Sequence, residues 1–295
     1  MTNPPPTPGG RPILLTGAAG FIASHVAQRL LARGERIVGV DNFDPYYDRA
    51  LKERNLREVI DDAQGRFEAV EADLTNAAQM RDLFARVRPA GVIHLAAKAG
   101  VRPSIADPVG YAHANVTGTM VMLECAREAG CDRIVVASSS SVYGNAASVP
   151  FSETQDVSQP ISPYAATKRA CELIGHTHWH LTKMPTAMLR FFTVFGPRQR
   201  PDLAISHFLR RIAAGETIRM FGDGSTSRDY TYIDDIVTGV VAAYDRIDQH
   251  GYRIWNLGGN HPTSLREMIA TIGRVVGKEP VIETAPMQPG DVERT

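Results

Sequence analysis

The fold is decided by the segment Ile13-Leu14-Leu15-Thr16-Gly17-Ala18-Ala19-Gly20-Phe21-Ile22-Ala23-Ser24-His25-Val26. Its first four residues predict a short buried strand, and the residues after Gly20 predict a helix. Gly17 permits the tight turn between them, and Gly20 lets backbone N–H groups at the helix N-terminus approach a pyrophosphate. Ala23 keeps the third small position, where helix and strand pack closely. The segment predicts a dinucleotide site, provided that the rest of the chain supplies the context.

The next predicted strand, over 36–40, ends at Asp41, which lies 21 residues after Gly20. This is close to the spacing at which a dinucleotide-binding unit places the acid that binds the adenosine ribose. A carboxylate there would repel a 2′-phosphate, so NAD is favoured over NADP. An ordinary turn residue is the alternative interpretation of Asp41, and the preceding glycines favour the ribose role.

Strand-like and helical segments continue to alternate. Further strands are predicted over 66–70, 91–97, 133–137 and 186–191. The alternation predicts an α/β fold built on a Rossmann-type, doubly wound parallel sheet, with ligands at the carboxyl ends of the strands. The glycine turn, Asp41 and a serine run over 138–141 all follow strand ends, so motifs and fold agree.

The composition is that of an ordinary globular protein, with 295 residues, 43% hydrophobic residues and a formal net charge of +0. A neutral chain gives no case for a nucleic-acid partner. The proline-rich start lacks the basic and apolar regions of a signal peptide, and no apolar run approaches the ~20 residues that span a bilayer. Cys125, Cys131 and Cys171 form no CxxC pair, which favours reduced, buried thiols. We expect a cytoplasmic protein with no membrane partner.

A helix predicted to start at Ser162-Pro163 carries a candidate base. Tyr164 and Lys168 are four residues apart and therefore share one helix face. An unperturbed tyrosine, with a pKa of about 10, is a poor base at neutral pH. A nearby positive charge favours the phenolate and lowers that pKa. The pair therefore predicts proton abstraction from an alcohol in a nicotinamide-dependent oxidation.

The glycine turn, Tyr164 and Lys168 together resemble the extended short-chain dehydrogenases/reductases, in particular the NAD-dependent epimerase/dehydratase family, over 11–295. Members that act on nucleotide sugars carry segments like His94-Leu95-Ala96-Ala97 and Ser227-Arg228-Asp229-Tyr230-Thr231-Tyr232-Ile233-Asp234-Asp235. The resemblance implies that Tyr164 is the catalytic base, that Lys168 binds the nicotinamide ribose and that Ser139 binds the reacting oxygen. The cofactor contacts that it implies are Gly17, Gly20, Phe21, Ile22, Asp41, Asn42, Asp73, Leu74, Leu95, Ala96, Ala97, Lys98, Asn115, Ser138, Tyr164 and Lys168.

The same resemblance implies a UDP-sugar site. Arg228 would contact the diphosphate, and Phe221 ends the strand that usually passes beside uracil. The full set of implied substrate contacts is Arg102, Ser139, Ser140, Ser141, Thr193, Arg200, Phe221 and Arg228. Arg198 lies in the same proline-flanked loop as Arg200 and is a further candidate.

The serine run separates the subfamilies. Dehydratases resemble Thr-Asp-Glu at Ser139, Ser140 and Ser141, and UDP-glucuronate decarboxylases carry Glu at Ser141. This chain has only hydroxyls there, so the acid that those reactions need is missing. Epimerisation at C4 needs no such acid, because the hydride returns to the opposite face of the sugar.

Three segments resemble UDP-glucuronate 4-epimerases, namely 41–48, 99–104 and 190–202. Most other relatives have Asn at Thr193, and in the glucuronate epimerases Thr193 and Arg200 match residues associated with the sugar carboxylate. An Arg guanidinium suits a carboxylate through a two-point fork. The resemblance implies 4-epimerisation of UDP-glucuronate to UDP-galacturonate without decarboxylation. The alternatives are a UDP-glucose or UDP-N-acetylglucosamine 4-epimerase and, less favoured, UDP-glucuronate decarboxylase.

The resemblance also divides the chain. We expect a disordered tail over 1–10, an NAD-binding domain over 11–190 to which 228–258 returns, and a smaller α/β substrate-binding lobe over 191–227 and 259–295. Relatives usually continue for another helix or two, so this lobe is expected to be truncated at the C-terminus. They usually form homodimers through two helices per subunit, which here start near Asn115 and Tyr164.

Two other interpretations of the sequence are possible. His176 and His180 share a helix face, as two zinc ligands would, but no third ligand is visible, and no metal site is expected. A dinucleotide-binding regulatory or scaffold protein without chemistry is the alternative class. The presence of Ser139, Tyr164 and Lys168 argues against it.

Overall fold

The computed structural model describes residues 10–146, 148–287 and 292–295. Residues 1–9 of the predicted tail and residues 288–291 of the predicted substrate-binding lobe lie outside these ranges. Among the described residues, none of the helices is long and apolar enough to cross a membrane.

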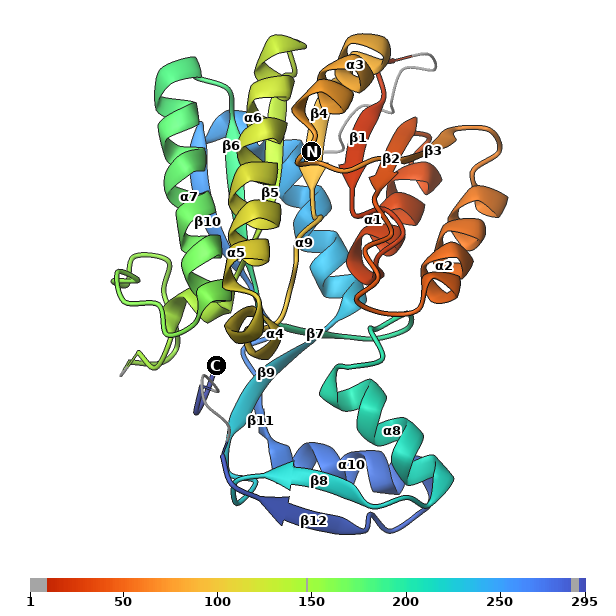
Figure 1. Ribbon diagram of the computed structural model, residues 1–295, viewed down its shortest axis with the longest axis vertical. Helices are drawn as coiled ribbons and strands as arrows, with labels where there is room; N and C mark the ends of the chain where they lie inside the picture. Colours follow the sequence, from red (N-terminus) through yellow and green to blue (C-terminus); the bar gives the residue numbers. More distant parts are fainter. Residues whose placement is uncertain (1–9, 147, 288–291) are drawn as a thin grey trace.

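A seven-stranded parallel sheet forms the upper part of the molecule in Figure 1, in the order β10-β6-β5-β4-β1-β2-β3. Its strands are β1 (Ile13–Thr16), β2 (Ile37–Asp41), β3 (Phe67–Glu71), β4 (Gly91–His94), β5 (Arg133–Ser139), β6 (Thr186–Phe191) and β10 (Tyr252–Leu257). The order reverses on either side of β1, which is the topological switch point where such sheets bind their ligands. The prediction of a doubly wound parallel sheet is confirmed.

Helices cover both faces of this sheet (Figure 1). They are α1 (Phe21–Ala32), α2 (Arg49–Asp62), α3 (Ala77–Val87), α5 (Pro108–Tyr111), α6 (Gly118–Glu128), α7 (Pro163–Thr182) and α9 (Ile233–Arg246). The short helix α4 (Val101–Ala106) lies below the carboxyl ends of the strands in Figure 1. A π-helical turn over Ala112–Thr117 joins α5 to α6, and short 3-10 turns span Ser140–Tyr143 and Ile247–Gln249.

The sheet separates two hydrophobic cores. Leu15 of β1 packs with α1 and α9, whereas its neighbour Leu14 packs with α3 and α6 on the opposite face. Successive side chains of a strand point to opposite faces, so an uninterrupted apolar strand feeds both cores. Burial of each such side chain contributes about 1.5–3 kcal/mol. The rigid sheet fixes the strand ends where the site forms.

A smaller lobe lies below the carboxyl ends of the strands in Figure 1. It contains α8 (Ala204–Ala214), β8 (Ile218–Phe221), α10 (Leu265–Val276) and β12 (Ile282–Ala285), with β8 and β12 paired in parallel. A second small sheet, of order β11-β9-β7, joins the two parts and consists of β7 (Thr193–Phe195), β9 (Ser227–Tyr232) and β11 (Pro262–Ser264). The chain leaves the large sheet after β6 and returns to it through α9 and β10, as the register of β10 on β6 shows.

Candidate active site

The glycine turn after β1 has the geometry of an anion cradle. Gly17 has a φ of +71°, and a Cβ atom added there would lie 3.0 Å from the backbone of Ala96. A Cβ atom at Gly20 would lie 3.0 Å from the carbonyl oxygen of Gly17. The first N–H groups of α1, which opens with Phe21 and Ile22, have no acceptor within the helix, and the helix dipole makes this end attractive to phosphate. The turn is therefore shaped for a pyrophosphate.

Asp41 lies at the end of β2, directly beside this turn. Its carboxylate accepts hydrogen bonds from the backbone N–H groups of Ala19 (3.1 Å) and Phe43 (2.8 Å). Burial raises the pKa of Asp41, although these hydrogen bonds and the Lys52 charge oppose the rise. The side chain of Asn42 donates to Asp73 at 3.2 Å, so the segments that follow β2 and β3 lie together.

The segment after β4 closes the other side of the cradle. The backbone N–H of Ala96 donates to the hydroxyl of Thr16 at 3.1 Å. The side-chain amide of Asn115, which is buried, bonds both the N–H and the carbonyl of Lys98, at 2.8 and 3.0 Å. Asn115 thus holds the segment 95–98 in place, and the Lys98 ammonium pairs with Asp107 at 2.9 Å.

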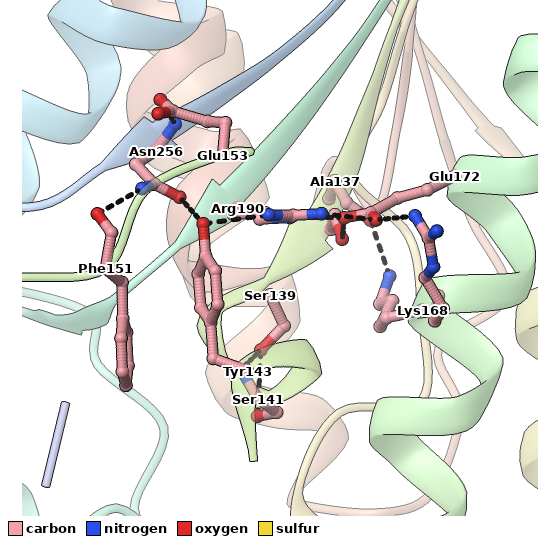
Figure 2. A network of polar contacts seen from close by, with 12 residues as sticks. Ala137, Ser139, Ser141, Tyr143, Phe151, Glu153, Lys168, Glu172, Arg190 and Asn256 are labelled. Carbon is pink, nitrogen blue, oxygen red and sulfur yellow. Dashed lines mark hydrogen bonds and ion pairs between the residues drawn. The ribbon is translucent and has the colours of Figure 1, made fainter. Parts of the chain in front are cut away.

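Helix α7 starts at the position that the sequence predicts. Ser162 is the N-cap, and its hydroxyl accepts the N–H of Ala165 at 3.1 Å. The backbone N–H of Tyr164 donates to the hydroxyl of Ser104 at 3.0 Å, which ties α7 to α4. Lys168 is buried, and its ammonium donates to the carbonyl oxygen of Ala137 at 2.8 Å (Figure 2). The helix with the predicted base is therefore fastened to β5.

The serine run forms the end of β5 and the 3-10 turn that follows. Ser139 donates to the Ser141 hydroxyl at 3.0 Å and accepts the Ser141 N–H at 3.1 Å. Ser138 points differently, because its hydroxyl donates to the carboxylate of Glu172 at 2.7 Å. The hydroxyls of Ser139 and Ser141 thus lie together in the turn (Figure 2), whereas the hydroxyl of Ser138 is committed to a buried acid.

A buried polar network behind the turn was missed by the sequence reasoning. Glu172 and Arg190, both with 0% side-chain exposure, form a two-point ion pair with both contacts at 2.8 Å. Arg190 also donates to the Tyr143 hydroxyl at 2.8 Å, and Tyr143 donates to Asn256 at 2.8 Å (Figure 2). The network joins α7, β6, the serine turn and β10. Its sequence signal was an acid four residues after Lys168 and an arginine inside an apolar strand.

The predicted substrate residues come from the second half of the chain and the loop after β4. The Arg102 guanidinium lies over the Phe221 ring, 5.0 Å from its centroid. Thr193 begins β7 opposite Tyr230, and Arg228 lies on β9, where its guanidinium donates to the Ser227 carbonyl at 2.9 Å.

Arg200 is largely buried and makes a two-point pair with Asp202, at 3.0 and 2.7 Å. Arg198 points elsewhere: it donates to Glu58 on α2 and to Gln28 on α1, at 2.9 Å each. Arg198 therefore connects this loop to the large domain, and this role replaces the interpretation of Arg198 as a substrate contact.

The residues present fit a dinucleotide. A turn in which a Cβ at Gly17 or Gly20 would crowd the backbone, a helix N-terminus and a largely buried acid at the next strand end match the donors and acceptors of NAD. The histidines of α7 offer no comparable set: the His176 and His180 rings stack 6.4 Å apart, and the described residues hold no group of three or more potential metal ligands.

A Rossmann-type sheet with a cradle at its switch point and a Tyr–Lys helix beside the serine turn defines an enzyme of the extended short-chain dehydrogenase/reductase class. The chain belongs to the NAD dependent epimerase/dehydratase family, whose sequence profile matches residues 13–258. It is 41% identical, over 96% of its length and 87% of the relative, to a protein of Rhizobium meliloti named probable UDP-glucuronate 4-epimerase. A UDP-glucuronate 4-epimerase of Thermodesulfobacterium geofontis is 40% identical over 96% of this chain and 86% of the relative.

The fold agrees with a solved structure of the same kind. The UDP-glucuronic acid 4-epimerase of Bacillus cereus, crystallised with UDP-glucuronic acid and NAD, superposes with a TM-score of 0.89 at 35% identity. The match covers 96% of this chain and 88% of that one. The resemblance to the family and its NAD dependence are confirmed.

Proposed function

We propose that this protein converts UDP-glucuronate to UDP-galacturonate by NAD-dependent 4-epimerisation through a 4-keto intermediate, without loss of carbon dioxide. One observation carries the proposal: the turn beside Tyr164 and Lys168 presents the hydroxyls of Ser139, Ser140 and Ser141 and no acid. The similarity to UDP-glucuronate 4-epimerases over nearly the whole chain supports the choice of sugar.

The chain's own residues supply binding and proton transfer. Gly17, Gly20 and Asp41 would hold the adenosine and pyrophosphate half of NAD, and Lys168 the nicotinamide ribose. NAD, when bound, supplies the acceptor and donor of hydride at C4 of the sugar. Tyr164 takes the proton of the C4 hydroxyl and returns it after the sugar has turned, while Ser139 binds the C4 oxygen.

The 4-keto intermediate formed by oxidation of the sugar can undergo a side reaction. A 4-keto sugar with a carboxylate on C5 is a β-keto acid, which loses carbon dioxide when the breaking bond aligns with the carbonyl π system. Arg200, Thr193 and the serine hydroxyls are proposed to hold the carboxylate out of that alignment. A glutamic acid at Ser141, the donor that would favour decarboxylation, is absent.

The substrate assignment separates this function from the neutral-sugar alternatives. A UDP-glucose or UDP-N-acetylglucosamine epimerase has no carboxylate to bind, whereas the largely buried Arg200 guanidinium is held near the site by a two-point ion pair with the partly exposed Asp202. Charge of this kind is costly to bury and suits a site that recognises an anion. The homodimer and the cytoplasmic location stay predictions of the sequence.

The direct test incubates purified protein with UDP-glucuronate and resolves the products by NMR. We expect UDP-galacturonate to accumulate to an equilibrium mixture, with NAD retained by the protein. UDP-pentose as the main product, with no UDP-galacturonate, would show that the protein is a decarboxylase.

A further inference from the structure

Arg200 is fixed by three contacts from three parts of the chain. Asp202 binds it through Nε and Nη2, the carbonyl of Ala99 accepts from Nη1 at 3.2 Å, and the Tyr46 ring lies 4.9 Å below the guanidinium carbon. The guanidinium is also close enough to Tyr164 for an electrostatic interaction between the two side chains. Arg200 therefore occupies one defined position beside the proposed base.

The hydrogen-bond count shows what this arrangement leaves for a ligand. A guanidinium has five N–H groups. Asp202 takes two and Ala99 takes one, so these contacts leave two, one on each terminal nitrogen. Two N–H groups on two nitrogens are what a two-point fork to a carboxylate uses. Asp202 can therefore orient Arg200 while the N–H groups on the two terminal nitrogens of Arg200 stay available for the substrate carboxylate.

Asp202 is in turn held by Tyr46. The Tyr46 hydroxyl donates to Asp202 Oδ2 at 3.1 Å. Burial would raise the pKa of Asp202, but the Arg200 and Tyr46 contacts outweigh it and hold that pKa below its usual value. Tyr46 lies five residues after Asp41, in the loop that begins at the proposed ribose carboxylate. The contacts of Tyr46 with Asp202, and of Asp202 with Arg200, thus connect the loop after Asp41 to Arg200.

We infer that Asp202 and Tyr46 are positioning residues that aim the free fork of Arg200 at the carboxylate of a UDP-uronate, and so set the preference for acidic over neutral UDP-sugars. The inference rests on the proposed function and extends it to two residues outside the proposed substrate and cofactor contacts. An unrestrained arginine would reach the carboxylate only after losing rotamer freedom on binding. In this protein, Asp202, Ala99 and Tyr46 already restrict the rotamers of Arg200 before a ligand binds.

The test measures steady-state kinetics of the NAD-bound enzyme with Asp202→Asn and Tyr46→Phe. In the same assay, UDP and UDP-glucose serve as competitive inhibitors that lack the carboxylate. For Asp202→Asn we expect KM for UDP-glucuronate to rise about tenfold, equal to about 1.4 kcal/mol of binding. The inhibition constants of UDP and UDP-glucose should change less than twofold, and kcat less than threefold.

Tyr46→Phe keeps the ion pair and removes only the phenol contact, so a smaller rise in KM is expected, with no threat to folding at a partly exposed site. The double variant should show less than the sum of the two effects, because both act through Arg200. Asp156→Asn is the matched control: Asp156 is an exposed aspartate that accepts hydrogen bonds from Ser158 and makes none with Arg200 or Tyr46.

Three results would overturn the inference. A lower KM for UDP-glucuronate in Asp202→Asn would show that Asp202 competes with the substrate carboxylate. Equal losses for UDP-glucuronate, UDP-glucose and UDP would show a general role in loop structure. A wild-type enzyme that binds UDP but leaves UDP-glucuronate unchanged would refute the proposed function itself, and that result needs no variant.

Discussion

The ammonium of Lys168 donates a 2.8 Å hydrogen bond to the carbonyl oxygen of Ala137, two residues before Ser139. One contact therefore ties the helix that carries Tyr164 to the strand that ends in the serine turn. Because both partners are buried, the distance between the proposed base and the hydroxyls is set by the fold rather than by the ligand.

Tyr164→Phe tests the role of the base. The substitution removes one hydroxyl and leaves the ring, which packs edge-on against Tyr111 with centroids 6.2 Å apart. General base catalysis contributes about 10²–10⁴-fold, so kcat should fall at least about 100-fold. The dissociation constant of UDP-glucuronate, measured by calorimetry, should change less than threefold. Activity within tenfold of wild type would assign proton transfer to another group.

The Glu172–Arg190 pair behind the serine turn should be a large determinant of stability. Removing one member of a buried pair leaves an uncompensated charge, which costs about 3–5 kcal/mol. Glu172→Gln should lower the free energy of unfolding, measured with urea, by about that amount. The exposed Arg49–Glu71 pair, with contacts at 3.0 and 2.7 Å, is the control: Glu71→Gln should leave the urea midpoint nearly unchanged. Similar effects of both substitutions would contradict the account.

The local signals in the sequence were enough for the large sheet and for the cofactor end of the site. Gly17, Gly20 and Asp41 belong to one continuous βαβ unit, so spacing alone brings them together. The Tyr164–Lys168 helix was likewise predictable, because its N-cap Ser162 and Pro163 define its start.

The orientations of the other side chains of the site depend on contacts between distant segments of the chain. The Ser138 hydroxyl donates to Glu172, which pairs with Arg190, and these two residues lie 34 and 52 residues further along the chain. Arg198 and Arg200 look equivalent in sequence, yet Arg198 has a φ of +63° and points to α1 and α2. No periodicity predicts such a choice, which follows from the charges that tertiary packing places nearby.

Asp41→Asn tests the cofactor site. The carboxylate accepts two backbone N–H groups and is expected to bind the ribose hydroxyls, so loss of its charge weakens both interactions. We expect NAD affinity to fall about 10- to 100-fold and discrimination against NADP to narrow. The measurement is the NAD content of purified protein and the dissociation constants of both cofactors. Asp48→Asn, at the N-cap of α2, is the control, because Asn caps a helix as well as Asp. Unchanged retention of NAD in Asp41→Asn would contradict the assignment.

His94 should make the stability of the protein depend on pH. Its ring is buried between the hydroxyls of Thr16 (2.8 Å) and Thr119 (3.2 Å), and burial, with a smaller effect of the Lys168 charge, lowers its pKa to about 3. The unfolded chain, with a histidine pKa of about 6.5, binds a proton between these values that the native state does not. Native stability therefore falls as pH drops below about 6.5.

The expected size follows from that difference in proton binding. Between pH 8 and 5.5, His94 removes about 1.4 kcal/mol of stability. In His94→Gln this dependence should vanish, so the stability gap between wild type and variant should shrink by about that amount over the same range. Urea unfolding at both pH values measures it, and other histidines cancel because both proteins contain them. A constant gap would mean that His94 binds its proton equally well in the native and unfolded states.

The fate of the keto acid gives the sharpest prediction about the site. Ser141→Glu places a proton donor where decarboxylases carry one, and Thr193→Asn replaces a hydroxyl proposed to hold the carboxylate. Each substitution should raise the ratio of UDP-pentose to UDP-galacturonate, and the double variant should raise it most. Ser158→Glu, at an exposed position of the loop before α7, controls for added charge. The measurement is the product ratio by NMR, with the release of carbon dioxide followed in parallel. If both variants lose epimerisation without releasing carbon dioxide, then restraint of the carboxylate is not what protects the intermediate.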